Sequence, residues 1–460
     1  MAGTTRRFAA ALVAAAAVAA ALAAGARAAN RVYWGNYGNN TISFANLDGS
    51  GSGGQLTTSG ATTPTNVEGV AIDAPAGLIY LANFLPGRIS YTRLDGSGGG
   101  DLNTTGANTM FVYGLALDPE GGRVYWANVA GVSYAKLDGS GGGNLNTTGA
   151  STSDPYGIAV DHAGGRVYWT NNTGTRISYA NLDGSGGGDL NTTGATVDRA
   201  DGLAVDPAGG RVYWTNGIAN VISWAALNGS GGGNLTTTGA HVAHPNAVAI
   251  DHAAGRIYWT NYSGSVVSYA RLDESGGGDV PTTGATASNP QFLALLEAPG
   301  AAEAPVVSGG KRPGSQLACT QGSWLADLAP SFLAQAPQTF SYRWARNGHL
   351  IGLARSSTYA PGKAGSYSCS VTAENAAGTA IQTSQAHAIL ADCIVPKVVG
   401  KTLRTAKRAI RRKHCRVGRV RRHSARVRTG RVVSQRPKPG RHLANGAKVN
   451  LVVSRGKKRR

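Results

Sequence analysis

The sequence of 460 residues lacks the short motifs that carry much of enzyme chemistry. It contains no nucleophile elbow for a serine, no His-Glu-x-x-His pair for zinc, no P-loop for phosphate and no cysteine–histidine spacing of a metal site. Methionine, phenylalanine and charged residues are scarce, whereas glycine occurs 66 times. These absences exclude the commonest nucleophile, phosphate and zinc enzymes and predict no cofactor, and the composition is typical of short strands and turns.

Long apolar runs are also missing, except near the N-terminus. Arg6 and Arg7 precede a run of small apolar residues at 8–24, and an A-x-A type of cleavage site follows at 26–28. Residues 1–29 are therefore predicted to be a secretory signal peptide, which makes the protein secreted. The alternative is an N-terminal anchor that is kept.

Cysteine is absent from the first 318 residues, and four cysteines follow. An exported chain meets oxidising conditions, so an even number of cysteines favours disulfides. Four cysteines allow three pairings.

Acidic residues are absent from the last part of the chain. Residues 393–460 contain 24 Lys or Arg and no Asp or Glu, whereas residues 30–392 contain 17 basic and 24 acidic residues. This asymmetry predicts contact between the C-terminal region and a polyanion. Nucleic acid is not expected as the natural partner, because the chain is predicted to be exported and residues 393–460 have no aromatic side chain for stacking.

What the sequence does contain is a repeat, Arg-Val-Tyr-Trp-x-Asn or a close variant, at spacings of 43 to 47 residues. One unit reads as strands at 157–161, 166–171 and 177–182, with a fourth strand expected at 190–193. Four strands in about 45 residues are typical of a propeller blade. The tyrosines of the six copies are Tyr33, Tyr80, Tyr125, Tyr168, Tyr213 and Tyr258.

The two ends of the array indicate how a ring would close. The first unit lacks its leading strand, and an extra apolar segment at 292–296 follows the last unit. That segment is expected to complete the first blade, which leaves no exposed sheet edge. We therefore predict a six-bladed β-propeller over residues 30–297.

This region resembles the YWTD propellers of the low-density-lipoprotein-receptor family. The resemblance rests on Tyr-Trp-Thr-Asn at 168–171, 213–216 and 258–261, and on the Leu-Asp-Gly turns. The acidic fourth position of the family motif is Asn in every unit here: Asn36, Asn83, Asn128, Asn171, Asn216 and Asn261. An amide can still bridge backbone groups at a strand end, so the fold is expected to survive.

One position varies from blade to blade, just before each leading strand. In a propeller this position lies beside the central channel, so the six residues are expected to form a ring around one mouth. A polar ligand such as a sugar or peptide would bind there, and the alternative is a solvated rim without a ligand. The ring comprises Glu68, Tyr113, Tyr156, Asp201, Asn246 and Gln291.

A small number of residues in the propeller are candidates for a catalytic role. Glu68 and Asp201 are the only carboxylates of the ring, and they belong to opposite blades, so they are a possible acid/base pair. His241 and His244 lie in a loop before the ring position and are read as surface residues, with an approach to the mouth as the alternative. We expect no metal site.

After a linker at 298–305, residues 306–391 resemble an immunoglobulin-like β-sandwich. The resemblance rests on two cysteines, a core tryptophan at Trp344 and Tyr367 two residues before the second cysteine, as in a tyrosine corner. It implies the pairing Cys319–Cys369 and an inserted loop near 327–337. The domain is expected to act as a spacer.

Residues 392–456 resemble a PASTA domain, and a basic tail follows at 457–460. The resemblance rests on Val-Pro-x-Val-x-Gly at 395–400, Gln-x-Pro-x-Pro-Gly at 435–440 and the pattern at 446–456. It implies peptidoglycan as partner. Cys393 and Cys415 flank the helix expected at 401–413, so we expect them to form a disulfide, although the family does not need one. The basic residues expected to contact an anionic polymer are Arg404, Lys407, Arg408, Arg411, Arg412, Arg421 and Arg422.

These predictions combine into a mainly β chain: a six-bladed β-propeller, a β-sandwich and a small α+β PASTA-like domain. The expected function is that of an exported cell-envelope binding protein, in which the PASTA-like domain attaches to peptidoglycan or an anionic wall polymer and the propeller binds an unknown protein or glycan. The alternatives are a propeller lyase or hydrolase that acts through channel residues, and a purely structural wall protein.

Overall fold

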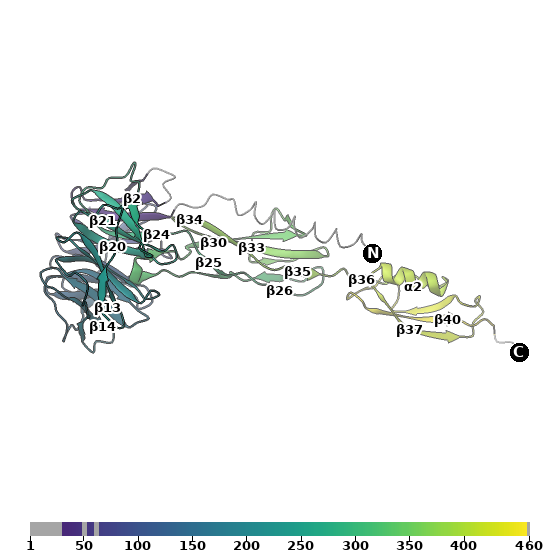
Figure 1. Cartoon of the computed structure of the whole chain (residues 1–460). Helices are drawn as coiled ribbons and strands as arrows, with labels where there is room; N and C mark the ends of the chain where they lie inside the picture. The colour runs from purple at the N-terminus through teal and green to yellow at the C-terminus, as the bar shows by residue number, and fades with distance from the viewer. Residues whose placement is uncertain (1–29, 48–52, 59–63, 458–460) are drawn as a thin grey trace.

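The computed structural model describes residues 30–47, 53–58 and 64–457 (Figure 1). The predicted signal peptide and residues 458–460 of the basic tail lie outside the described residues. The chain is elongated, with a ring of sheets at one end, a β-sandwich in the middle and a small α+β domain at the other end. Among the described residues, no helix is both long and apolar enough to cross a membrane.

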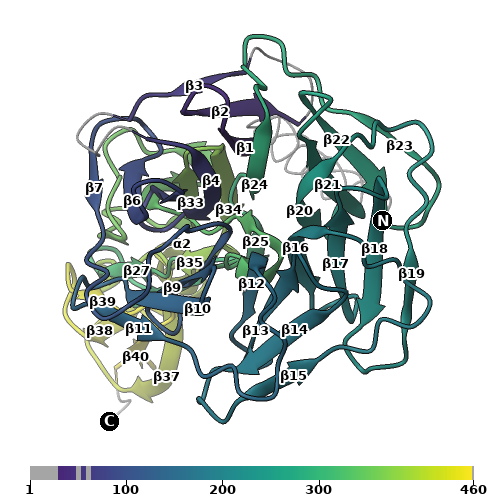
Figure 2. The ribbon, with the colours of Figure 1, turned by 90° about the vertical axis from the view of Figure 1, so that its left-hand side faces the viewer.

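Six antiparallel sheets surround a central channel, which confirms the predicted propeller fold (Figure 2). The inner strands are β4 (Val67–Asp73), β8 (Leu115–Asp118), β12 (Pro155–Asp161), β16 (Ala200–Asp206), β20 (Pro245–Asp251) and β24 (Pro290–Leu296). The second strands are β1 (Arg31–Asn36), β5 (Leu78–Asn83), β9 (Arg123–Asn128), β13 (Arg166–Asn171), β17 (Arg211–Asn216) and β21 (Arg256–Asn261). The third strands are β2 (Thr41–Asn46), β6 (Arg88–Arg93), β10 (Gly131–Lys136), β14 (Ile177–Asn181), β18 (Val221–Ala226) and β22 (Val266–Arg271). The outer strands are β3 (Gly54–Leu56), β7 (Gly99–Asp101), β11 (Gly142–Asn144), β15 (Gly187–Asp189), β19 (Gly232–Asn234) and β23 (Gly277–Asp279).

The ring closes through the first blade, as the sequence predicts. β24 pairs antiparallel with β1, and Leu295 lies opposite Val32 in the register. Trp34 donates from its indole nitrogen to the backbone oxygen of Thr286 at 3.1 Å, which adds a side-chain contact across the same seam. Because the first blade combines both ends of the array, the sheet edges at the seam are paired.

The asparagine of the repeat serves as both a donor and an acceptor. In the fourth blade, Asn171 Nδ2 donates to Ser178 Oγ at 2.8 Å, and Asn171 Oδ1 accepts from the Ser153 amide at 2.8 Å. Ser178 in turn donates to Asp189 at 2.6 Å. An aspartate at position 171 has no donor for Ser178, so the amide fits this chain better than the family's carboxylate.

The fourth strand of each blade lies earlier than the sequence predicts. In the fourth blade β15 spans Gly187–Asp189, whereas the expected strand at 190–193 is a turn in which the Thr193 amide donates to Asn191 Oδ1 at 3.1 Å. A Cβ on Gly187 would collide with the Tyr179 backbone, and one on Gly188 would lie 3.1 Å from the Tyr179 hydroxyl. The outer strand therefore forms on glycines, which alone allow this close approach.

The middle domain is a β-sandwich built on two main sheets. One sheet contains β26 (Val307–Gly309), β27 (Leu317–Cys319) and β32 (Thr358–Tyr359). The other contains β30 (Thr339–Arg346), β31 (His349–Leu350), β33 (Gly365–Asn375), β34 (Gly378–Thr383) and β35 (His387–Ile389). β25 (Ala301–Glu303) pairs with β28 (Ser323–Trp324) at the end nearer the propeller.

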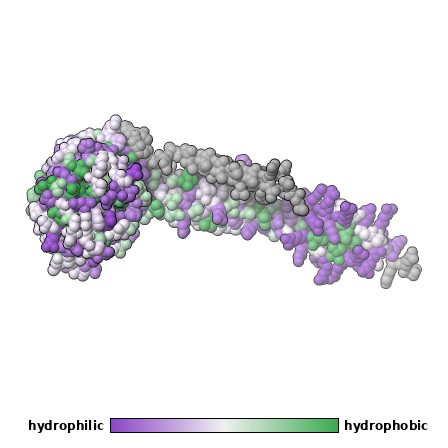
Figure 3. All heavy atoms as spheres, viewed as in Figure 1, coloured by the Kyte–Doolittle hydropathy of each residue, from purple (hydrophilic) through white to green (hydrophobic). Residues whose placement is uncertain are grey.

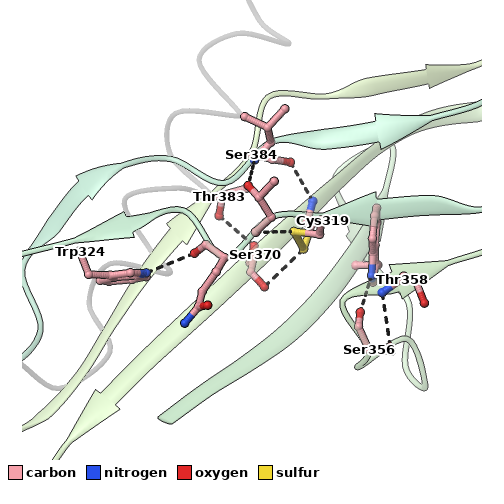
Figure 4. Close-up of a disulfide and its surroundings, with 12 residues drawn as sticks. Cys319, Trp324, Ser356, Thr358, Ser370, Thr383 and Ser384 are labelled. Atoms are coloured by element: carbon pink, nitrogen blue, oxygen red, sulfur yellow. Dashed lines mark hydrogen bonds between the residues drawn. A yellow bond between two sulfur atoms is a disulfide. The ribbon is translucent and has the colours of Figure 1, made fainter. Parts of the chain in front are cut away.

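Three expected features of the sandwich are confirmed. The disulfide Cys319–Cys369 joins the two sheets, and Ser384 Oγ accepts from the Cys369 amide at 3.0 Å (Figure 4). The Tyr367 hydroxyl donates to the backbone oxygen of Lys363 at 2.7 Å, which is the hydrogen bond of a tyrosine corner. Trp344 is fully buried beside the disulfide.

The inserted loop of the sandwich enters the propeller. It forms the short 3-10 helix η1 (Ala329–Ser331) and β29 (Leu333–Ala334), which pairs in parallel with β24. η1 contacts the inner strands β8, β12, β16 and β20. Ser331 Oγ donates to the Val205 backbone oxygen at 2.7 Å, and Phe332 and Leu333 are buried in the propeller core. We call residues 327–336 the plug, because they close the end of the channel where the inner strands finish.

The C-terminal domain packs one helix on a small sheet. α2 (Leu403–Arg412) begins after Thr402, whose hydroxyl caps the Thr405 amide at 3.3 Å. The sheet contains β37 (Arg416–His423), β40 (Lys448–Ser454) and β38 (Val432–Arg436), and β36 (Cys393–Ile394) pairs with β39 (His442–Leu443). The disulfide Cys393–Cys415 is present as expected.

Candidate functional site

The six ring residues lie at the end of the channel opposite the plug, where the inner strands begin. Four of them are almost completely buried, with exposed fractions between 2% and 5%: Glu68, Asp201, Asn246 and Gln291. Tyr113 and Tyr156 are partly exposed. The structure therefore places these residues at one mouth, but most of the ring is sealed rather than solvated. Whether a ligand binds them stays a prediction.

The hydroxyl of Tyr156 connects the ring across the channel. It donates to Glu68 Oε2 at 3.0 Å and accepts from Asn246 Nδ2 at 3.3 Å, with Gln291 Oε1 3.4 Å away as a further acceptor. These residues come from four different blades, so Tyr156 ties blades together that are not neighbours in sequence. Burial raises the pKa of Glu68 to about 8, partly offset by the Tyr156 hydrogen bond, and the nearby Asp201 charge raises it further. Glu68 therefore carries a proton at neutral pH.

Asp201 occupies a different environment from Glu68. Asn172 Nδ2 donates to Asp201 Oδ1, and His244 Nε2 lies 3.6 Å from Asp201 Oδ2. Burial raises the pKa of Asp201 to about 7, against the opposing effects of Arg199 and the Asn172 hydrogen bond. Burial therefore raises the pKa of both ring carboxyls well above that of an exposed carboxyl.

Aromatic side chains line one side of the mouth. Phe84 stacks on Phe111 with ring centroids 5.0 Å apart and contacts Tyr113 at 5.4 Å. Tyr113 contacts Tyr156 at 4.8 Å, and Tyr156 contacts Phe292 at 5.6 Å. An aromatic path therefore runs from the exposed rim into the channel.

A second ring lies two residues before the first, and the sequence reasoning did not find it as a set. Each of its members adopts the left-handed backbone conformation, with φ between 48° and 57°: Asn66, Phe111, Asp154, Arg199, His244 and Asn289. Residues other than glycine rarely adopt this conformation. The signal was available, because the residue type at this fixed position also varies around the ring, and only Asn66 and Asn289 are alike.

The four histidines of the propeller occupy three different settings. His244 belongs to the mouth and its ring contacts Tyr262 at 5.3 Å, which fits the alternative considered from the sequence. His241 instead lies beside Asp279. His162 and His252 lie at the turns that follow the inner strands, where they contact Asp118 at 3.1 Å and Asp206 at 2.8 Å. Of the four, only His244 is close to the ring.

The basic residues of the C-terminal domain form two patches. The helix patch lies along α2, where five exposed cations surround one surface hollow: Arg404, Lys407, Arg408, Arg411 and Arg412. Arg421 lines a separate hollow on the sheet with Arg419 and Arg436, and Arg422 is exposed beside it on β37. Figure 3 shows this end of the molecule as largely hydrophilic around a small apolar area.

Residues 394–455 match the PASTA domain family, and residues 210–252 match the low-density lipoprotein receptor repeat class B family. Both resemblances expected from the sequence are thereby confirmed. A propeller of this repeat type and a PASTA domain fit a binding or scaffold role, and a PASTA domain in a chain with two disulfides fits an extracellular setting. No curated protein matches the chain.

Several solved structures are similar to part of the chain. A chain in the crystal structure of a nidogen/laminin complex is 18% identical, with a TM-score of 0.48, and the match covers 58% of this chain and 98% of that one. A Bacteroides fragilis protein assigned as a 6-phosphogluconolactonase is 13% identical with a TM-score of 0.42, covering 59% and 98%. A protein from Lactobacillus plantarum is 14% identical with a TM-score of 0.42, covering 58% and 100%.

Proposed function

We propose that this chain is an exported binding protein of the cell envelope. In this proposal the C-terminal domain holds the chain on peptidoglycan or an anionic wall polymer, and the propeller mouth presents a binding face for a protein or glycan. The observation that carries the proposal is the arrangement of the two candidate surfaces. The helix patch and the mouth lie at opposite ends of one elongated molecule (Figure 1).

Charge supports the attachment role of the C-terminal domain. The helix patch presents five exposed cations on a single helix, and the sequence of residues 393–460 contains no acidic side chain to neutralise them. A surface with one sign of charge attracts phosphate- or carboxylate-bearing polymers over several ångströms, and salt screens this attraction. The PASTA match adds glycan recognition as a contribution that does not depend on charge alone.

The plug supports the binding role of the propeller. Because residues 327–336 close one end of the channel, a ligand has access to the ring from the mouth only. The plug also fixes the sandwich on the far side of the propeller, so the mouth points away from the C-terminal domain (Figure 2). Wall attachment would therefore leave the mouth free.

The test is retention on purified cell-wall sacculi across a salt series. The full chain is compared with a version that ends at Asp392 and with two full-length variants. The first variant removes three helix-patch charges, Arg404→Gln, Lys407→Gln and Arg411→Gln. The matched control removes three exposed charges from the propeller, Arg93→Gln, Lys136→Gln and Arg271→Gln.

We expect the truncated chain to lose retention and the helix-patch variant to be retained less at low salt than the control. Retention by the full chain that persists at high salt would indicate specific glycan recognition, whereas retention that disappears with modest salt would indicate attachment to an anionic polymer. Equal retention of the full and truncated chains would overturn the attachment role of the C-terminal domain.

A further inference from the structure

The C-terminal domain carries a second cationic surface, on its sheet. Arg419 and Arg421 lie on β37, Arg436 ends β38, and Lys438 follows in the next turn. All four side chains are exposed and line one hollow of about 610 Å³. We call these four residues the sheet patch. Because residues 393–460 contain no Asp or Glu, no acidic side chain of the domain neutralises this patch.

The strand β40 shows which face of the sheet carries the patch. Its residues Leu451 and Val453 are buried in the same core as Ile410 of α2. Asn450 and Val452 alternate with them and therefore face away from the helix, because successive side chains of a strand point to opposite faces. Asn450 and Val452 line the same hollow as the sheet patch. The hollow thus lies on the face of the sheet that α2 does not cover.

The cations of the sheet patch flank β40 on both sides. Arg421 lies opposite Val452 in the pairing of β37 with β40, and Arg436 lies opposite Asn450 in the pairing of β38 with β40. Neighbouring strands are about 4.8 Å apart, so the two rows of cations are about 10 Å apart at the backbone. Asn450 Oδ1 accepts from the Arg419 amide at 2.7 Å, which fixes this side chain between the rows. A polymer strand that lies along β40 would have cations on both sides.

The helix patch faces in the opposite direction. Arg404, Lys407 and Arg411 surround a hollow on the exposed side of α2, whereas Ala406 and Ile410 are buried against the sheet. Figure 1 places α2 on one side of β37 and β40, and Figure 3 shows hydrophilic side chains on two sides of a small apolar area. A helix has a diameter of about 10–12 Å with its side chains. One anionic group therefore cannot contact both patches.

We propose that the C-terminal domain binds two strands of an anionic polymer at once, one on the helix patch and one in the sheet patch, and so joins them. This inference rests on the proposed attachment role and adds a second site and a cross-linking activity. The polymer carries phosphate or carboxylate groups along its length, because a guanidinium group pairs with the oxygens of either group through two parallel hydrogen bonds.

The test is a capture assay with the full-length protein. One polymer is immobilised, the protein is bound to it and washed, and a fluorescent copy of the same polymer is added. Inorganic polyphosphate and poly-glutamate of matched length are used in separate arms, and uncharged dextran is the control polymer. We expect the bound protein to capture the fluorescent polymer in at least one arm, and that arm identifies the anionic group. Dextran should not be captured.

Three full-length variants locate the two sites. The helix-patch variant carries Arg404→Gln, Lys407→Gln and Arg411→Gln. The sheet-patch variant carries Arg419→Gln, Arg421→Gln and Arg436→Gln. The matched control loses three exposed cations of the same domain that line neither hollow, Arg426→Gln, Arg428→Gln and Arg441→Gln.

Each patch variant should still bind the immobilised polymer through its remaining patch. Its capture of the fluorescent polymer should fall about tenfold or more, because each exposed charge pair contributes a factor of up to about five. The control variant should capture the fluorescent polymer like the parent. An equal loss of capture in all three variants would show that only the total charge matters and would overturn the inference.

Capture in neither arm by the parent would also overturn the inference, as would full capture by both patch variants. Sacculus retention measured on the same preparation separates the two proposals, because attachment requires only one patch. Retention without capture refutes the joining of two strands and leaves the attachment role intact. Loss of both retention and polymer binding refutes the attachment role as well.

Discussion

Substitution of Glu68 by glutamine should stabilise the protein at alkaline pH. Glu68 is 5% exposed and its carboxyl accepts the Tyr156 hydroxyl at 3.0 Å, an acceptor role that a glutamine amide oxygen keeps. Burial raises the pKa of Glu68 from 4.5 to about 8 in the folded protein. A carboxyl with a raised pKa stabilises the fold below its unfolded pKa, and this contribution is lost as the pH rises through the folded value.

The size of the effect follows from the two pKa values. Each tenfold change in proton affinity corresponds to about 1.4 kcal/mol, so Glu68 removes about 4 kcal/mol of folding free energy between pH 5 and pH 9. Glutamine does not titrate, so Glu68→Gln should gain this amount over the parent at pH 9 and little at pH 5. For a domain of this size the gain corresponds to about 8–16 °C in melting temperature. Asp201 also titrates, but it is present in both proteins.

Differential scanning calorimetry at pH 5 and pH 9 measures this gain as the shift of the propeller transition. The matched control is Glu120→Gln, because the side chain of Glu120 is 76% exposed. Its melting temperature should follow the parent at both pH values. A shift for Glu68→Gln that is equal at pH 5 and pH 9, or absent at pH 9, would refute the argument that burial sets the pKa of Glu68.

Two further predictions concern the plug and the repeat. Leu333→Ala removes a side chain that is 2% exposed in the plug and should lower the free energy of unfolding by about 2–5 kcal/mol in thermal melts. Leu353→Ala, at a position 97% exposed, should have no such effect, and equal melting of both variants would show that the plug does not stabilise the propeller. Asn171→Asp removes the donor to Ser178 at a fully buried site and should cost about 1–3 kcal/mol in the same assay. Asn228→Asp, in an exposed turn where other blades carry aspartate, is its control, and an unchanged melting temperature for Asn171→Asp would contradict the bonding role of the amide.

The sequence predicted the propeller well because every blade repeats the same short pattern of strands and turns. The apolar alternation of each second strand and the spacing of the tyrosines do not depend on distant parts of the chain. Even the closure of the ring was predictable, since the array has one strand too few at its start and one too many at its end. The outer strands were misplaced because glycine carries no apolar pattern, although glycine is what lets β15 approach Tyr179.

The positions of the candidate-site residues could be predicted from the sequence, but the groups that surround them could not. Comparison of blades identified Glu68 and Asp201 at the mouth, yet no local pattern shows that Tyr156 crosses the channel or that Glu68 is buried. These features depend on which blades face each other. The plug was visible only as an inserted loop, because its partners lie in several strands that are distant from it in the sequence, as for Ser331 and Val205, which are 126 residues apart.

The pairing of β24 with β1 has a consequence for the order in which the chain can fold. The leading strand of the first blade comes from residues 290–296, so strands β1 to β3 cannot complete a four-stranded blade until nearly the whole propeller has been synthesised. Contacts between residues this far apart in sequence form slowly, because a long loop must first be closed. Until then, β1 exposes an unpaired apolar edge on which another chain could pair. The nascent propeller is thus most prone to aggregate during the interval that ends when β24, and then β29 beside it, is added.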